Sequence, residues 1–225
     1  MKLKVCGMKY QDNIKQVATL QPDYLGFIFY DKSARNFDSE TIPDIDNSIK
    51  KTGVFVDASI DFVLEKVEKY NLQAIQLHGN ESQGYCNDIK NCLAKLVLAS
   101  HTIEVIKVFS IKDEFNFEVL KPYESVCDYF LFDTKGKLLG GNGYTFNWNV
   151  LNNYPSTKPF FLSGGLGINE IENIKQFSNS KASKYCYALD LNSKFEIEPG
   201  LKNISILKKF KKNLNMILDP KKKQL

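Results

Sequence analysis

The chain has 225 residues, of which 43% are hydrophobic and 25% are charged, and its formal net charge is +4. This is the composition of a globular protein large enough to fold without a metal or disulfides, and so small a charge does not indicate nucleic-acid binding. Five cysteines without CxxC spacing, no secretory leader before the first strand-like run and no apolar stretch of about 18 residues predict a cytoplasmic protein.

Short runs rich in β-branched and aromatic residues recur along the chain, with helix-like segments after nearly every run. The runs predict eight strands, at Leu3–Cys6, Tyr24–Phe29, Gly53–Val56, Ala74–Leu77, Val105–Phe109, Tyr129–Phe132, Phe160–Leu162 and Cys186–Leu189. The clearest helical patterns are Ile60–Tyr70, Asn169–Phe177 and about Leu201–Ile217. Asn169 precedes Glu172 by three residues, as in a capping box. In the segment Cys92–Ile103, Leu96–Leu98 fits either a helix end or an extra strand.

Strands that alternate with helices predict parallel pairing, and eight such units either close into a barrel or form an open doubly wound sheet. The glycine-rich turn expected after the first strand of a dinucleotide-binding fold is absent, because Cys6-Gly7-Met8 stands there. No linker divides the chain. The sequence therefore predicts one α/β domain over residues 1–225, a (β/α)8 TIM barrel that ends in a short basic tail at about 218–225.

Chemistry in such a barrel gathers at the carboxyl ends of the strands, because the loops that follow them form one face. The polar residues at these points are Cys6, Asp31, Arg35, Asp57, His78, Ser110, Asp133, Ser163-Gly164-Gly165, Asp190, Asn192 and Ser193. They are the candidate site residues.

Cys6 ends the first strand, and Gly7 after it lets the backbone turn closely. A thiolate at Cys6 would abstract a proton from carbon if its pKa were brought toward neutrality; the alternative is a buried, inert cysteine. Lys4 has the same strand parity as Cys6 and would lie one layer beneath the thiol. Its ammonium group would favour the thiolate, and Asp190 is its candidate partner.

Asp133 closes an apolar strand, where burial favours the protonated carboxyl group that a general acid needs. The alternative role for Asp133 is a cap on the next segment. The following Gly140–Gly143 predicts either a mobile loop over the site or a simple turn. Arg35 is the only arginine among 30 basic residues. Its planar guanidinium suits a carboxylate ligand better than any lysine does, although it also fits an ordinary surface residue.

Ser163-Gly164-Gly165 follows the seventh strand and Asn192-Ser193 the eighth, the two places where these barrels often bind phosphate. Both are also compatible with simple turns. His78 is one of two histidines, and a lone histidine more often positions a group than reacts. No metal-ligand set is evident, so we expect neither a metal nor a cofactor.

Several collinear motifs carry a family resemblance. They are Lys4–Met8, Leu25–Tyr30 with Lys32–Arg35, Gly53–Val56, Gln76–Gly79, Phe132–Thr134, Gly140–Gly143 with Phe146–Trp148, and Leu162–Leu166. In this order they resemble the phosphoribosylanthranilate isomerase family of tryptophan biosynthesis, over about residues 2–215.

The resemblance implies an Amadori rearrangement of an aminoaldose to a ketose without a cofactor. Asp133 would be the general acid that opens the sugar ring, and Cys6 the general base that takes the C2′ proton. Arg35 would hold the anthranilate carboxylate, while Gly7 and His78 would also contact the substrate. The two small-residue turns would bind the phosphate. We expect a phosphorylated small molecule as the only partner of a monomer or homodimer.

The chain departs from the family pattern at Lys194, where a glycine is usual. The phosphate loop would lose a close backbone approach there or gain an ammonium group. Two alternatives remain. Another phosphosugar isomerase is one, although the histidine-pathway enzyme pairs two aspartates and Cys6 occupies the first of those places. A barrel that binds a phosphorylated ligand without catalysis is the other.

Overall fold

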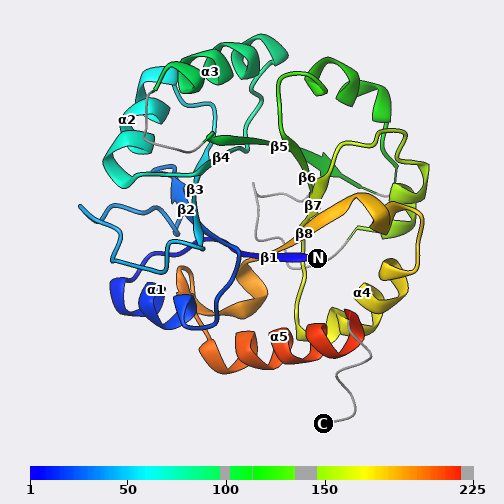
Figure 1. Cartoon of the computed structure of the whole chain (residues 1–225). Helices are drawn as coiled ribbons and strands as arrows, with labels where there is room; N and C mark the ends of the chain where they lie inside the picture. The colour runs from blue at the N-terminus through cyan, green and yellow to red at the C-terminus, as the bar shows by residue number, and fades with distance from the viewer. Residues whose placement is uncertain (97–101, 113, 135–145, 219–225) are drawn as a thin grey trace.

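The computed structural model describes residues 1–96, 102–112, 114–134 and 146–218. Eight parallel strands pair in chain order, and the last pairs with the first, so the sheet closes into a barrel (Figure 1). The strands are β1 (Lys2–Val5), β2 (Tyr24–Phe29), β3 (Lys50–Phe55), β4 (Ala74–Leu77), β5 (Glu104–Ile111), β6 (Tyr129–Thr134), β7 (Phe160–Leu162) and β8 (Cys186–Leu191). All eight predicted strands are present, and the predicted TIM barrel is confirmed.

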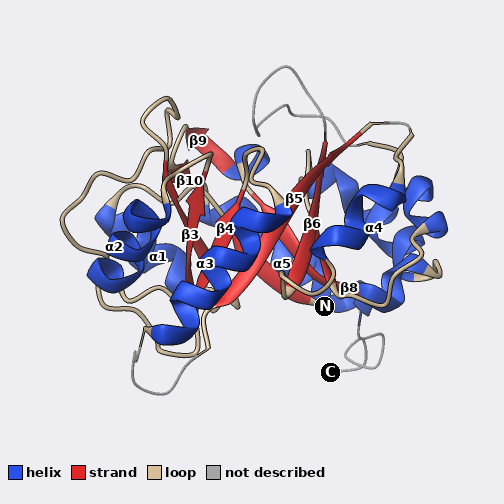
Figure 2. Cartoon of the chain, turned by 90° about the horizontal axis from the view of Figure 1, so that it is seen from above, coloured by secondary structure: helices blue, strands red, loops and turns tan. Residues whose placement is uncertain are grey.

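Five α-helices of the described chain lie outside the barrel (Figures 1 and 2). They are α1 (Gln11–Ala18), α2 (Ile60–Tyr70), α3 (Gln83–Lys95), α4 (Ile171–Ser178) and α5 (Ile204–Leu218). The helix predicted at Ile60–Tyr70 is confirmed as α2. It begins there because the hydroxyl of Ser59 caps it by accepting from the amide of Phe62. Its buried residues, among them Val63 and Val67, form the apolar stripe that faces the barrel.

Three crossovers contain no α-helix in the residues that the structure describes, so the expectation of a helix after nearly every strand is wrong for these. The link from β2 to β3 is irregular and returns along β2, where the amide of Phe37 donates to the carbonyl of Ile28 at 2.7 Å. The other two links carry 3-10 segments, η1 (Phe117–Tyr123) and η2 (Trp148–Asn153). Pro122 lies inside η1, where it removes a backbone donor and opposes an α-helix.

The segment after β8 also differs from the prediction. A short 3-10 turn, η5 (Ser193–Phe195), leads into a hairpin in which β9 (Glu196–Glu198) pairs antiparallel with β10 (Leu201–Lys202). The helix predicted to begin at about Leu201 begins after Asn203 instead, and the side-chain oxygen of Asn203 caps the first turn of α5. Local periodicity did not reveal the hairpin because its strands are only two or three residues long.

The predicted capping box is wrong. Asn169 lies within a 3-10 turn, η3 (Ile168–Glu170), that precedes α4. The N-cap of α4 is Glu170, which makes no side-chain cap hydrogen bond, so Asn169 and Glu172 do not pair as predicted. One more 3-10 turn, η4 (Ala182–Tyr185), precedes β8.

Two predictions fall partly outside the described residues. Of Leu96–Leu98, only Leu96 is described, and it is the C-cap of α3. Of the tail expected at about 218–225, only Leu218 is described, and it is the last residue of α5. Within the described ranges, no helix combines the length and apolar character needed to cross a membrane.

An apolar layer fills part of the barrel interior. Tyr24, Ile106, Leu131 and Phe161 belong to it, and the ring of Tyr24 packs edge-on against that of Phe161 at a centroid distance of 5.4 Å. These residues occupy the amino-terminal part of the strands, so the open cavity of the barrel lies at the carboxyl ends.

Candidate active site

A cavity of about 520 Å³ lies at the carboxyl ends of the strands, the end of the barrel that also carries β9 and β10 (Figure 2). Ten residues were given a catalytic or substrate-binding role from the resemblance, and nine of them line it: Cys6, Arg35, His78, Asp133, Ser163, Gly164, Gly165, Asn192 and Ser193. Its volume suits one small-molecule ligand. Residues far apart in the sequence thus meet at one place.

Gly7 is not among the lining residues, contrary to expectation. A Cβ atom at Gly7 would come within 2.7 Å of Asn192 Oδ1 and 2.8 Å of Arg35 Cδ. Its φ of 75° lies in the left-handed region that glycine adopts without strain. Gly7 therefore serves the site by leaving room for two side chains that do line the cavity.

Cys6 is held at the end of β1 by its amide, which donates to the carbonyl of Leu191 at 2.8 Å. Its side chain is 3% exposed and lies over Gly26 of β2, where a Cβ atom would come within 2.7 Å of the sulfur. Sequence reasoning assigned no role to Gly26. A glycine inside a strand is a signal of close approach by another group, and here the group is the Cys6 thiol.

Lys4 lies beneath the thiol with Asp190 as its partner, as strand alternation predicted. Nζ of Lys4 donates to Oδ1 of Asp190 at 2.9 Å, and the lysine side chain is 0% exposed. Burial acts to lower the pKa of Lys4, but the combined effect of Asp190 and Cys6 is larger and opposite, so the net shift of the pKa is upward. The lysine therefore stays charged inside the barrel.

Burial is the dominant influence on the thiol and raises the pKa of Cys6. The ammonium groups of Lys4 and Lys202 act in the opposite direction, while Asp190 adds to the rise. The expected effect of Lys4 on the thiolate thus has the right sign, but burial outweighs it.

His78 connects Asp133 to a buried glutamine. Nε2 of His78 lies 3.5 Å from Oδ2 of Asp133, and its Nδ1 lies 3.1 Å from Nε2 of Gln76. Because an amide NH2 group donates, Nδ1 of His78 accepts, and the proton of a neutral imidazole is on Nε2, facing the carboxyl group. The other oxygen of Asp133 accepts from the amide of Thr134 at 2.8 Å. One carboxyl oxygen is therefore held by a hydrogen bond, and the other faces the His78 ring.

Arg35 lines the cavity and is also bound by a carboxylate of the chain itself. Its Nε donates to both oxygens of Glu196, at 2.9 and 3.0 Å, and its Nη2 donates to Oε2 at 2.6 Å. The side chains are 19% and 5% exposed. Arg35 is therefore a held side chain, contrary to its alternative interpretation as an ordinary surface residue.

Lys202 of β10 joins the same cluster. Its Nζ donates to Glu196 Oε1 at 2.7 Å and to Asn192 Oδ1 at 2.8 Å. Burial lowers the pKa of Lys202 to about 8, although Glu196 and Cys6 act to raise it. The burial of Glu196 would raise its pKa, but Arg35 and Lys202 lower it, and the net shift is downward. Glu196 is thus a carboxylate between two cations.

The two small-residue turns face the same cavity. Ser163 is placed by its amide, which donates to the carbonyl of Phe132 at 2.8 Å. Gly164 has a φ of 86°, and a Cβ atom there would collide with Thr134 Oγ1. The turn therefore requires glycine both for its backbone angle and for its close contact with β6. Backbone amides in such turns are suitable ligands for a phosphate.

Three candidates at strand ends are not brought to the cavity. Asp57 accepts a hydrogen bond from the amide of Asn80 at 2.6 Å and so joins two loops. Asp31 and Ser110 are exposed. The predicted loop at Gly140–Gly143 lies outside the described residues.

The family described as N-(5'phosphoribosyl)anthranilate (PRA) isomerase matches residues 3–213 of the chain. The chain belongs to this family. The N-(5'-phosphoribosyl)anthranilate isomerase of Parabacteroides distasonis is 40% identical, over 98% of this chain and 95% of the relative. The solved phosphoribosyl anthranilate isomerase of Thermotoga maritima is 28% identical with a TM-score of 0.77, covering 96% of this chain and 98% of that chain. The Thermus thermophilus structure, at 23% identity, shares the fold with a TM-score of 0.78 over 96% and 100% of the two chains.

Membership of the phosphoribosylanthranilate isomerase family confirms the predicted enzyme class, an aldose–ketose isomerase. Four residues that contact the predicted site residues were assigned no role from the sequence: Gly26, Gln76, Glu196 and Lys202. Gln76 carried a usable signal, since it has the strand parity of His78, and Gly26 carried one as a glycine inside a predicted strand. Glu196 and Lys202 carried none, because their hairpin was not predicted.

Proposed function

We propose that this chain isomerises N-(5′-phosphoribosyl)anthranilate to 1-(2-carboxyphenylamino)-1-deoxyribulose 5-phosphate in L-tryptophan biosynthesis, with Asp133 as general acid and Cys6 as general base. The observation that carries these roles is that a carboxyl group and a thiol reach one cavity from β6 and β1. Both are nearly buried, and a cation lies next to the thiol.

The first step is ring opening. Asp133 gives its proton to the furanose oxygen, the C1′–O bond breaks, and the lone pair of the anilino nitrogen forms a C1′=N double bond. His78 and the amide of Thr134 hold the two carboxyl oxygens, so that the carboxylate left behind is stabilised where it forms.

The second step is proton abstraction at C2′. The thiolate of Cys6 takes the proton, and the electron pair of the C–H bond moves through C1′ to the positively charged nitrogen. The resulting enolamine tautomerises to the ketone. Ring opening creates positive charge on the nitrogen beside the thiol, which adds to the charge of Lys4 and lowers the pKa of Cys6 when the base is required.

The cavity would hold the substrate's two anionic groups at separate sets of residues. The phosphate would lie at Ser163–Gly165 and Asn192–Ser193, and the anthranilate carboxylate at Arg35. The apolar lining residues Ile28 and Val54 would contact the aromatic ring. No cofactor is required, because the substrate's own nitrogen is the electron acceptor.

The same proposal includes a cytoplasmic location, a phosphorylated small-molecule ligand and a small assembly. Binding of a phosphorylated small molecule agrees with the family, and the five cysteines are free, as expected for a reducing cytoplasm. A dimeric phosphoribosylanthranilate isomerase from Thermotoga maritima has been described, and the chain itself is proposed to be either a monomer or a homodimer.

Turnover of freshly prepared phosphoribosylanthranilate, followed by the loss of anthranilate fluorescence, tests the proposal. We expect Cys6→Ala and Asp133→Asn to lower kcat by about 10²–10⁴-fold each while folding normally. No turnover by the wild-type chain at micromolar concentration would overturn the assignment. A chain that binds the substrate but never converts it would instead be the non-catalytic phosphate-binding barrel.

A further inference from the structure

Glu196 is a nearly buried carboxylate that neither proton-transfer step uses. Its Oε1 accepts from Arg35 Nε, from Lys202 Nζ at 2.7 Å and from the amide of Gly200 at 3.0 Å. Its Oε2 accepts from Nε and Nη2 of Arg35, at 3.0 and 2.6 Å. Four donor groups of the chain thus make five hydrogen bonds to the carboxylate, which is occupied by the chain itself.

The contact with Arg35 determines which edge of the guanidinium remains available. Glu196 occupies the edge formed by Nε and Nη2. The second edge, formed by Nη1 and the other hydrogen of Nη2, is left for another planar acceptor. Because the guanidinium is rigid and planar, fixing one edge also fixes the direction of the other.

Lys202 anchors Glu196 from the far side. Its backbone is held by Asn13, whose side chain accepts from the Lys202 amide at 2.7 Å and donates to the Lys202 carbonyl at 2.9 Å. The lysine side chain is 0% exposed. Glu196 is therefore hydrogen-bonded to a lysine whose backbone is fixed, and its own hydrogen bonds to Arg35 fix the guanidinium in turn.

The charges of this cluster separate a positioning role from simple attraction. Arg35, Lys202 and Glu196 together carry one excess positive charge, which a substrate carboxylate would neutralise. Glu196 itself is negative, so on charge alone it repels the substrate carboxylate. If charge were its only effect, removing it would tighten binding. If its effect is to orient Arg35, removing it would weaken binding.

We propose that Glu196 is a positioning residue that sets the orientation of Arg35 for the carboxylate of the substrate. The inference rests on the proposed function, in which Arg35 binds that carboxylate. Glu196 does not touch the substrate, and its contribution is specific to ligands that carry the carboxylate.

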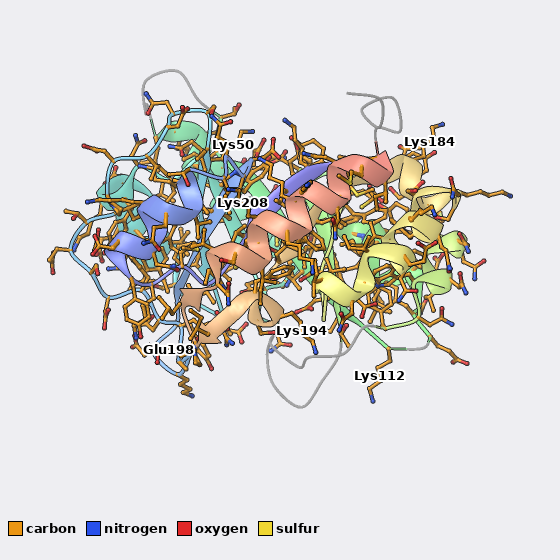
Figure 3. The ribbon with its side chains drawn as sticks, turned by 90° about the horizontal axis from the view of Figure 1, so that it is seen from below. Lys50, Lys112, Lys184, Lys194, Glu198 and Lys208 are labelled. Atoms are coloured by element: carbon orange, nitrogen blue, oxygen red, sulfur yellow. The ribbon has the colours of Figure 1, made fainter. Side chains whose placement is uncertain are left out.

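The test compares two ligands by calorimetry. One is reduced 1-(o-carboxyphenylamino)-1-deoxyribulose 5-phosphate, and the other is the same molecule without its carboxyl group. We expect Glu196→Gln to weaken the carboxylated ligand by about tenfold, the effect of one charged hydrogen bond, and to leave the second ligand within about threefold of wild type. Glu198→Gln is the matched control, because Glu198 lies in the same strand, is exposed (Figure 3) and, among the described residues, its side chain hydrogen-bonds to Tyr10 and not to Arg35.

A second variant guards against misfolding of the first. Glu196→Asp keeps the charge but withdraws the carboxylate by about 1.5 Å, the length of one C–C bond. It should lose carboxylate affinity in the same direction, with an unchanged far-ultraviolet spectrum. Unchanged binding of both ligands by Glu196→Asp, or tighter binding of the carboxylated ligand by Glu196→Gln, would overturn the inference.

Arg35→Ala separates this inference from the proposal beneath it. If Arg35→Ala fails to reduce the preference for the carboxylated ligand, the proposed role of Arg35 is wrong, and the inference fails with it. If Arg35→Ala abolishes the preference while both Glu196 variants retain it, only the inference is overturned.

Discussion

Gly26 of β2 lies directly against the sulfur of Cys6, so that a Cβ atom at Gly26 would come within 2.7 Å of the thiol. The same atom would come within 3.1 Å of the Cys6 Cα, so the side chain cannot avoid the contact by rotating alone. The proposed general base is thus placed by the absence of a side chain on the neighbouring strand.

Gly26→Ala should therefore lower kcat by about 100-fold, the usual effect of displacing a reacting group by roughly 1 Å. Folding should be retained, as judged by circular dichroism. Gly84→Ala is the control, because its nearest neighbour would be the Ser82 hydroxyl at 3.7 Å, and its activity should be unchanged. Full activity of Gly26→Ala would show that the position of the thiol does not limit the reaction.

Lys4→Met should make the thiol of Cys6 less reactive. Lys4 lowers the pKa of Cys6 against the effect of burial, so its loss should raise that pKa and slow alkylation by iodoacetamide at pH 8. The variant also leaves Asp190 buried without its partner, which should destabilise the fold by about 3 kcal/mol or more. The double variant Lys4→Met/Asp190→Leu should recover stability but not restore activity. Alkylation at the wild-type rate in Lys4→Met would contradict a role for Lys4 in activating the thiol.

Substrate affinity should decrease as the pH rises through about 8, the value to which burial lowers the pKa of Lys202. Above this pH Lys202 loses its positive charge, which weakens its hydrogen bonds to Glu196 and Asn192, and KM should increase. Arg35 favours this proton loss, while Glu196 and the Cys6 thiol oppose it. Lys202→Met should show a raised KM that no longer changes between pH 7 and 9. A wild-type KM that is flat across this range would be inconsistent with the shift.

The same shift has a definite sign for stability. The ordinary pKa of a lysine is 10.5, and in the folded chain burial lowers that of Lys202 to about 8. Between these values the unfolded chain holds one more proton than the folded chain, so the contribution of Lys202 to the free energy of unfolding should rise with pH. Denaturant titrations of wild type and Lys202→Met at pH 7 and 9.5 would measure it. A stability difference between the two proteins that does not change with pH would count against this prediction.

Lys194 should strengthen phosphate binding. Its stem passes Gly167, since a Cβ atom at Gly167 would come within 3.1 Å of the Lys194 Cβ, and Gly167 follows the turn that ends at Gly165. Figure 3 shows Lys194 at the same end of the molecule as Glu198, with Lys184 at the opposite end. Lys194→Gly should weaken inhibition by inorganic phosphate by about threefold at low salt, with a smaller effect at high salt. Lys184→Gly should have no effect on inhibition. If inorganic phosphate inhibits Lys194→Gly and wild type equally, the ammonium group of Lys194 does not contact the phosphate, and the prediction is wrong.

The sequence alone determined the repeating architecture and the residue types of the site. Runs rich in β-branched and aromatic residues located all eight strands, and alternation along the first strand placed Lys4 on the side of Cys6, because both signals are local. Position at a strand end then identified Asp133 and His78, since a closed parallel barrel brings all such ends to one face.

Only the tertiary structure decided what those side chains touch. Arg35 meets Glu196 across 161 positions of sequence, and Gly26 meets Cys6 between neighbouring strands. No periodic pattern contains such contacts, because they depend on the register of the barrel and on a hairpin too short to show in composition. The sequence could name a candidate base, a candidate acid and an arginine, while the fold decided that the candidate base is buried and that the arginine is already held by a carboxylate.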